Sequence, residues 1–477
     1  MNKRYISAAV FIIAVTAAVT DAAFGQEVMT VESCRAMALE NNRAVAIAGL
    51  NADKAGYTRN AYRANYFPKV TASANYLYSS ASIRQGISPA YLPTFTPAQD
   101  GSLTPNIVTA PDGSPVTGPD GSPVFKEYAY FPGMDMSLKM DGLIVAGVSV
   151  EQPIYTGGKI TAAFRMASIG GSIAGLGREL TRAGVIVKAD EAYYTYTMAS
   201  ETVGLARSYL AALSELLRNV EAAVETGLRH RNDALKVRVK VGEAELQLRR
   251  AENGAGLARK NLCHVTGLPL DSEVIIPATA GDGEGEEAMP QNTGSYDNRP
   301  EYAMLEKQVE LKDEEIRLVR SDFLPRGGLV ANYGYANGLT LNGSKALDRA
   351  SFSVLATVSV PVFQWGEGRN KVRAARAERA AAILQRDEAA EQMTLEISAA
   401  YDRCSESAIE VKMTAANLEQ AAANVEISRQ QYTAGMEPLS AYLEAQTTYH
   451  QAQITHLTAK TRQKLNQTHY QKATSTL

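Results

Sequence analysis

The amino-acid sequence predicts a mainly α-helical protein with a membrane β-barrel, built as a duplicated order of short helix, two strands, long helix and return helix. Three observations predict this fold: two long proline-free helical stretches, four short segments in which apolar and polar residues alternate, and a phrase that occurs twice. That phrase is VSVEQPIYTGGK at 148–159 and VSVPVFQWGEGR at 358–369. A duplication of this kind indicates a repeated structural unit, and it is read before any single motif.

The N-terminus predicts a secretory signal peptide over residues 1–25. Lys3 and Arg4 precede an apolar run at 6–19, and the small residues of Ala23-Phe24-Gly25 suit a cleavage site before Gln26. The alternative is an uncleaved anchor helix, but the apolar run is shorter than the roughly 20 residues that a span needs. We therefore expect export from the cytoplasm.

Composition argues against several classes of protein. The chain has 477 residues and a net charge of −3, which gives no reason to expect nucleic-acid binding. The cysteines Cys34, Cys263 and Cys404 are too scattered for a disulfide framework, so we expect small buried side chains. His264 beside Cys263 lacks a second ligand at useful spacing. The five histidines show no catalytic spacing, so we expect no enzyme, no metal and no cofactor.

Four segments alternate with period two and predict strands with one apolar face, at about 69–80, 142–154, 328–337 and 350–362. Ten-residue strands with tyrosines near one end and a polar opposite face suit an outer-membrane barrel. A soluble sheet with one buried face is the alternative, and alternation alone leaves both open.

The long helices are predicted at about 157–226 and 367–434, where proline is absent and strong helix formers dominate the second stretch. Pro153 and Gly227 are 74 positions apart, and so are Pro361 and Gly435. At 1.5 Å per residue, about 70 helical residues span roughly 100 Å, which suits an extended bundle better than a compact domain.

Shorter helices complete each repeat. The first repeat, 26–275, has helices at about 31–64 and 232–263, and the second repeat, 298–477, has them at about 301–321 and 439–469. An acidic, glycine-rich stretch within 276–297 predicts a linker between the repeats.

The two strand pairs are joined differently. The insert at 81–141 contains PDGSPV twice, at 111–116 and 119–124, and predicts two tandem tight turns within a large loop. The second pair has only about a dozen connecting residues, at 337–350. If the strands form an outer-membrane barrel, we expect the insert to be an extracellular loop, which covers the mouth or binds something outside.

The sequence resembles the TolC-like outer-membrane efflux and secretion channels over nearly all of the mature chain. The resemblance rests on the duplicated order, on the Phe67-Pro68 and Leu324-Pro325 junctions, and on the two repeated phrases. It implies a homotrimer in which each subunit gives four strands to one shared 12-stranded barrel on top of an α-helical tunnel. It also implies partnership with a periplasmic adaptor and an inner-membrane pump.

Within that resemblance, each repeated phrase is a barrel-to-helix junction. Proline has no N–H for the ladder and is expected to end strand pairing, and glycine takes backbone angles that other residues avoid. Tyr155, Phe363 and Trp365 suit a membrane–water boundary. A phosphate-binding loop is the weaker alternative, because GGK lacks the longer pattern. The expected junction residues are Pro153, Gly157, Gly158, Pro361, Gly366 and Gly368.

The ends of the long helices carry the residues that the resemblance links to gating. The tips expected to contact the adaptor are Gly227, Leu228, Gly435 and Met436, and the expected periplasmic gate residues are Asp233, Tyr432, Glu437 and Glu444. Ala441 and Glu437 depart from the family's pattern, so an arginine clasp from position 437 to Asp233 is not available. His230 and Arg231 are candidate substitutes, and a solvated helix face is the alternative for the whole set.

The function expected is that of a passive exit duct in the outer membrane of a Gram-negative bacterium, extending into the periplasm and serving a tripartite efflux pump. A type I protein secretion channel is the alternative within the family. A periplasmic coiled-coil adaptor is the alternative of another class, but it lacks whole-chain duplication. The long helices contradict a general porin.

Overall fold

A computed structural model describes residues 29–80, 82–277 and 294–477 of the chain. The signal peptide expected at 1–25 and most of the linker expected at 276–297 lie outside these residues. The chain divides into two compact units. Within the described residues, the helical unit comprises 29–57, 168–277, 294–312 and 378–477, and the sheet unit comprises 58–80, 82–167 and 313–377.

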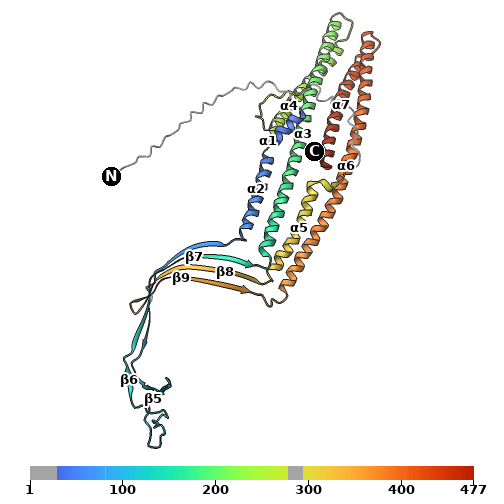
Figure 1. The fold of residues 1–477 in the computed structure, drawn as a ribbon. Helices are drawn as coiled ribbons and strands as arrows, with labels where there is room; N and C mark the ends of the chain where they lie inside the picture. Colours follow the sequence, from blue (N-terminus) through green and yellow to red (C-terminus); the bar gives the residue numbers. More distant parts are fainter. Residues whose placement is uncertain (1–28, 81, 278–293) are drawn as a thin grey trace, which may run out of the picture. The chain divides into compact units, whose positions relative to one another are not determined.

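Helices make up most of the chain and occur in the order that the duplication predicts (Figure 1). The two long helices are α3, Lys159–Glu225, and α6, Glu367–Thr433, and each has 67 residues. The others are α1 (Val31–Asn41), α2 (Arg43–Ala64), α4 (Arg231–Thr266), α5 (Pro300–Ser321) and α7 (Leu439–Ala473), with a short 3₁₀ turn, η1, at Tyr296–Asn298.

The single helix expected at 31–64 is divided at Asn42. Asn42 has an extended backbone with ψ of 124°, which ends α1. Its side-chain oxygen accepts a hydrogen bond from the Ala44 N–H at 2.9 Å and caps the start of α2. The prediction of one continuous helix was wrong because asparagine competes for backbone partners in this way.

The helical unit has three small hydrophobic cores. In the first, Cys34 of α1 and Cys263 of α4 are fully buried beside Tyr193 of α3, and Cys404 lies in the third. The prediction that the cysteines are small buried side chains is confirmed. Burial raises the pKa of the Cys34 thiol to about 12, which keeps it protonated and unreactive.

A buried ion pair joins three helices of the helical unit. Arg35 of α1 donates two hydrogen bonds to the Asp190 carboxylate of α3, at 2.7 and 2.6 Å. Thr468 of α7 donates a third at 2.8 Å. The Asp190 side chain is fully buried, so these partners replace the water that the carboxylate gives up.

The sheet unit contains an antiparallel sheet in the order β1-β7-β8-β9. Its strands are β1 (Lys69–Leu77), β7 (Met134–Tyr155), β8 (Arg326–Leu341) and β9 (Ser344–Ser359). The register aligns the alternating pattern of all four strands. Residues that lie opposite one another across the four strands form a row. On one face, the first such row is Val70, Val150, Ala331 and Val354, and the second is Ala72, Val148, Tyr333 and Phe352. The row between them, on the other face, is Thr71, Ser149, Asn332 and Ser353. Over these rows one face of the sheet is therefore apolar and the other polar, while the rows to either side of them on the second face also contain Val330, Leu355 and Val145.

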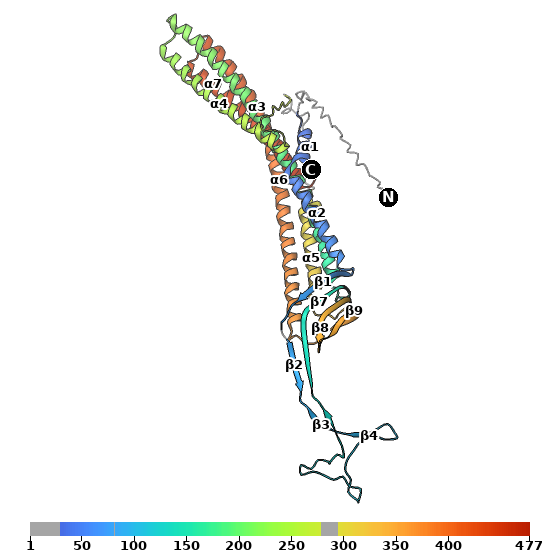
Figure 2. The same cartoon turned by 90° about the vertical axis from the view of Figure 1, so that its left-hand side faces the viewer.

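The insert expected as a loop is largely paired. β2 (Ser82–Ile87) continues along β7 beyond the end of β1, and β7 begins at Met134 rather than near 142. Two further strand pairs follow in the insert: β3 (Ala90–Pro93) with β6 (Tyr128–Phe131), and β4 (Phe95–Pro97) with β5 (Leu103–Pro105). β3 and β4 are labelled in Figure 2, and β5 and β6 in Figure 1. The ladder extends because pairing satisfies backbone groups that a loop would leave to water.

Turns of one kind recur in the insert. The two predicted turns lie at Asp112-Gly113-Ser114 and Asp120-Gly121-Ser122, and a third lies at Asp100-Gly101-Ser102. In each, the aspartate accepts a hydrogen bond from the serine N–H, and the glycine has φ near +80°. Glycine reaches that conformation without steric cost.

Two expectations about strand ends were wrong. β8 and β9 are joined by the two-residue turn Asn342-Gly343, with φ of 50° and 79°, and not by a dozen residues. Asn-Gly suits a tight hairpin whose twist matches the strands. Pro153 does not end β7, because the strand continues to Tyr155 through a bulge between the two residues. A bulge accommodates the missing N–H. β9 does end at Ser359, two residues before Pro361.

None of the helices in the described ranges combines the length and the hydrophobicity needed to cross a bilayer.

Candidate functional site

The tips of the two long helices end in the same backbone motif. Leu228 donates its N–H to the Ala223 carbonyl, and Met436 donates to the Gln431 carbonyl, both at 2.9 Å. The preceding residues, Gly227 and Gly435, both have φ of 77°. A left-handed glycine followed by this six-to-one bond is the Schellman helix ending. Gly227 and Gly435, which follow Pro153 and Pro361 by 74 positions each, thus mark the ends of two helices that finish in the same way.

The side chains that follow these glycines are exposed. Leu228 is 79 % exposed and Met436 is 76 % exposed. Schellman endings commonly bury this position against the last helical turn, which does not occur here. Each tip therefore presents one large apolar side chain to its surroundings.

Tyr432 lies in a stack of planar groups beside the tips. Its ring is parallel to that of Tyr442 of α7, with centroids 5.3 Å apart. The Arg229 guanidinium lies 4.7 Å from the Tyr432 centroid and donates to the Tyr432 carbonyl at 3.4 Å. Burial raises the pKa of Tyr432; Arg229 opposes that shift, and Asp233 adds to it. The cation that contacts the expected gate tyrosine is thus Arg229, which was not among the expected residues.

The carboxylates of the expected gate have separate environments. Asp233 lies 3.9 Å from Lys236, one turn along α4. Glu437 accepts a hydrogen bond from the Ser428 hydroxyl of α6. Glu444 is exposed and lines a groove between α4 and α7 with Lys236 and Lys240. In the single chain these three carboxylates are therefore not gathered into one cluster.

At the first strand–helix junction, the glycines are required by conformation and by space. Gly157 and Gly158 have φ of 64° and 88°. A Cβ on Gly157 would lie 2.8 Å from both the Leu324 Cβ and the Ser321 carbonyl oxygen. Only glycine fits between the end of β7 and the turn that follows α5.

The second junction packs against the same turn. A Cβ on Gly368, in the first turn of α6, would lie 2.8 Å from atoms of the Phe323 ring. Nearby, Gly366 has φ of 81° and Trp365 has φ of 48°, so the chain bends through two left-handed residues before α6. The turn 321–324 therefore contacts a glycine from each of the two strand–helix junctions.

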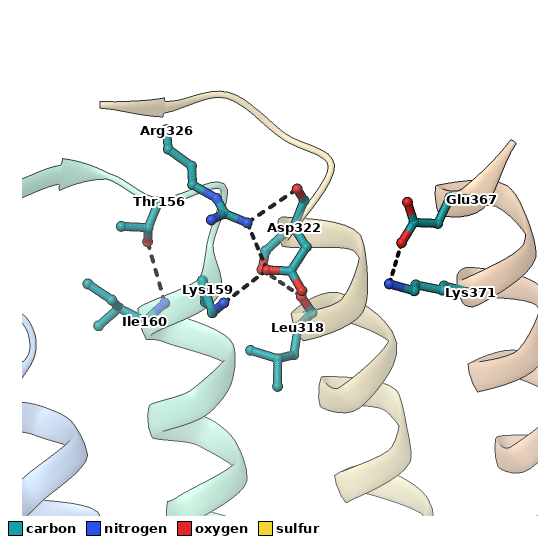
Figure 3. Close-up of polar contacts among 9 residues, drawn as sticks. Thr156, Lys159, Ile160, Leu318, Asp322, Arg326, Glu367 and Lys371 are labelled. Atoms are coloured by element: carbon teal, nitrogen blue, oxygen red, sulfur yellow. Dashed lines mark hydrogen bonds and ion pairs between the residues drawn. The ribbon is translucent and has the colours of Figure 1, made fainter. Parts of the chain in front are cut away.

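Asp322 of that turn holds charged groups from both repeats together (Figure 3). Its Oδ1 accepts hydrogen bonds from Lys159 Nζ, on the first residue of α3, at 2.9 Å, and from Arg326, the first residue of β8, at 2.8 Å. The hydrogen bond from Lys159 lowers the pKa of Asp322, and burial opposes that shift. Lys371 of α6 pairs with Glu367 at 2.6 Å and lies over the Phe323 ring at 5.9 Å.

The aromatic residues expected at a membrane boundary are exposed. Phe363 is 70 % exposed, Trp365 is 89 % exposed, and their rings meet edge to face at 4.8 Å. Tyr155 is 53 % exposed. Such a set on one chain indicates a surface that another phase or another copy covers.

Solved structures show which class of protein has this fold. The Campylobacter jejuni CmeC outer membrane channel is 18 % identical, with a TM-score of 0.69 over 93 % of this chain and 85 % of that one. The open-state Neisseria gonorrhoeae MtrE outer membrane channel is 17 % identical, with a TM-score of 0.69 over 93 % and 88 %. The Vibrio cholerae outer membrane protein VceC is 14 % identical, with a TM-score of 0.68 over 93 % and 95 %. The fold is therefore that of outer-membrane channels.

Sequence comparison matches parts of the chain to known proteins. Residues 295–474 match the family model described as outer membrane efflux protein. The alkaline protease secretion protein AprF of Pseudomonas aeruginosa is 25 % identical over 236 residues, which are 48 % of this chain and 48 % of AprF. The chain thus spans about half the length of the curated relative it matches. Together, the family match and the fold confirm the resemblance to TolC-like outer-membrane efflux proteins.

Proposed function

We propose that the protein is a passive exit duct of the outer membrane, through which solutes leave the periplasm without any bond chemistry. The observation that carries this proposal is the sheet, because its four strands align one apolar face and one polar face in register. An apolar face suits lipid and a polar face suits a water-filled lumen. A periplasmic coiled-coil adaptor does not need a sheet with one apolar and one polar face, because it does not cross the lipid.

The proposed assembly is a homotrimer with a shared 12-stranded barrel. β1 and β9 are the two edges of the sheet, and each has one side without a partner strand within the described chain. Unpaired edges are costly in lipid, so a membrane sheet must close. Edge-to-edge pairing of β9 with β1 of the next copy would close it, and three copies would supply twelve strands.

The two helix tips are the proposed contact with a periplasmic adaptor, through the exposed Leu228 and Met436. The proposed gate lies on the return helices, where three copies of Glu444 approach one another around the pore. Like charges at close range favour cations in the pore. Opening consists of loosening α7 and α4 at the tips, where Tyr432 stacks on Tyr442.

A type I protein secretion channel is the second candidate. The relative that favours it is AprF, whose name states secretion of an alkaline protease. An efflux pump is favoured by the description of the matching family. Deleting the gene distinguishes the two: drug sensitivity with normal secretion supports efflux, and loss of one secreted protein supports secretion.

Reconstitution tests the duct itself. Purified protein in detergent should run as a heat-modifiable trimer and should give discrete conductance steps in planar bilayers. Glu444→Ala should raise the conductance and reduce cation selectivity, while Glu310→Ala, which removes an exposed carboxylate paired with Lys307 of α5, serves as the control. A monomer that stays soluble without detergent and gives no conductance would refute the proposal.

A further inference from the structure

The polar face of the sheet changes character along its length. At the end next to the helices, Lys69 of β1 faces Glu151 of β7 in a row completed by Val330 and Leu355, and Arg326 begins β8. The next two rows of that face carry no charge; they are Thr71, Ser149, Asn332 and Ser353, then Ser73, Gly147, Gly334 and Ser351. Charge returns only at Arg349, one row further on.

Two hollows lie on either side of Glu151 at this end of the sheet. One, of about 290 Å³, is lined by Lys69, Lys159 and Glu151 together with Tyr62 and Asn65. The other, of about 330 Å³, is lined by Glu151 and Arg326 together with Gly327 and Gly328. The basic side chains of the strands and of the first turn of α3 therefore line hollows that share Glu151.

Cations outnumber carboxylates in this group. Lys159 and Arg326 share a single carboxylate, that of Asp322 (Figure 3). Lys69 faces Glu151 in the strand register. With three cations and two carboxylates, this group of side chains has a net charge of +1 in each copy of the chain. The side chains of Lys159, Asp322 and Arg326 are between 45 % and 48 % exposed, so their field reaches the solvent in front of them. The Debye length, over which salt screens the field of an exposed charge, is about 10 Å at 0.1 M salt.

We propose that Lys69, Lys159 and Arg326, with Glu151 and Asp322, form an electropositive collar that favours anionic groups of the solute in transit. This inference rests on the proposed function, since the polar face lines a lumen only in a closed barrel. The ligand class is a solute or peptide segment that bears carboxylate, phosphate or sulfate. The collar is opposite in sign to the proposed Glu444 ring, so the duct selects by charge at two separate places.

A pair of variants separates this electrostatic role from a structural one. Lys159→Gln and Asp322→Asn break the same ion pair, but they change the charge of the collar in opposite directions. The measurement is the reversal potential of the full-chain trimer in a KCl gradient across a planar bilayer. Lys159→Gln should shift it toward cation selectivity and Asp322→Asn toward anion selectivity. Both shifts should grow as the salt concentration falls.

Lys69→Gln keeps the test decisive if either variant fails to assemble. Lys69 lies outside the Asp322 ion pair, so its replacement should shift the reversal potential in the same direction as Lys159→Gln. Lys345→Gln, which removes a lysine paired with Asp348 near the β8–β9 turn, is the matched control and should leave it unchanged.

The outcomes distinguish the collar from the proposed function. Wild-type protein that gives no conductance overturns the duct, and the collar with it. A conducting channel whose Lys159 and Asp322 variants shift in the same direction, or in which Lys69→Gln and Lys159→Gln both leave the selectivity unchanged, overturns the collar alone.

Discussion

The Arg35–Asp190 ion pair allows a quantitative prediction. Arg35→Ala removes two hydrogen bonds from a carboxylate whose side chain is fully buried, and leaves it with the single bond from Thr468. Leaving a buried charge without its partner costs about 3–5 kcal/mol. α1 has only 11 residues, so this loss should appear as local opening of α1.

Hydrogen exchange of the full-chain protein measures that opening. At about 1.4 kcal/mol for each factor of ten, a loss of 3 kcal/mol raises the exchange rates of the amides of α1 on the order of one hundredfold. Glu191→Ala is the matched control, because its contact with His469 lies next along both helices and is nearly half exposed. Surface pairs of that kind contribute about 0–1 kcal/mol.

A double variant tests the reasoning behind the magnitude. Arg35→Ala combined with Asp190→Asn removes the buried charge as well as its partner, so it should cost less than the sum of the two single changes. If α1 exchanges within threefold of wild type in Arg35→Ala, or if the two changes simply add, the ion pair does not hold α1 in place.

Three further predictions concern single positions. Gly368→Ala should destabilise the full-chain protein by roughly 1–3 kcal/mol, because the added Cβ would meet the Phe323 ring. Gly170→Ala, at a position with open space around it, should stabilise the protein by about 0.4–1 kcal/mol. Thermal unfolding measures both changes, and equal effects would contradict the packing of Gly368 against Phe323. Burial lowers the pKa of His450 in the folded protein, so as the pH falls the unfolded chain binds a proton first, and the stability should fall below about pH 6.5. His450→Phe keeps a ring against Tyr209 and should make the melting temperature less dependent on pH in this range. Arg229→Ala should free the Tyr432 ring and speed proteolysis of the turn at 226–230, and a cleavage rate equal to that of wild type would show that Arg229 does not hold the tip.

The sequence predicted the parts of the fold that depend on local periodicity. Proline-free runs of strong helix formers define α3 and α6, and period-two alternation places Val70 and Val150 on one face of the sheet. Helix endings were also predictable, because Gly227 and Gly435 occupy the left-handed position that ends a helix. These features follow from residues close together in the chain.

Contacts between distant residues were not predictable. Nothing in the local sequence brings Gly157 and Gly368 to the same turn at 321–324, although each was singled out as a junction glycine. Arg229 was missed as the partner of Tyr432 because the two are separated by 203 positions. The β8–β9 turn is a different failure, since Asn342-Gly343 was a usable signal that was overlooked.

The three Asp-Gly-Ser turns of the insert bear on how this chain changes in evolution. The turns at Asp112 and Asp120 lie in two successive eight-residue segments, 109–116 and 117–124, and each is bridged within itself, at Thr109–Pro115 and at Thr117–Pro123. Each segment therefore satisfies its own turn, through the hydrogen bonds Ala110 N–H to Ser114 and Gly118 N–H to Ser122. A hairpin of this length can therefore be duplicated or lost as a single genetic event, so that relatives can differ in the length of the insert while the pairing of Met134–Tyr155 is kept.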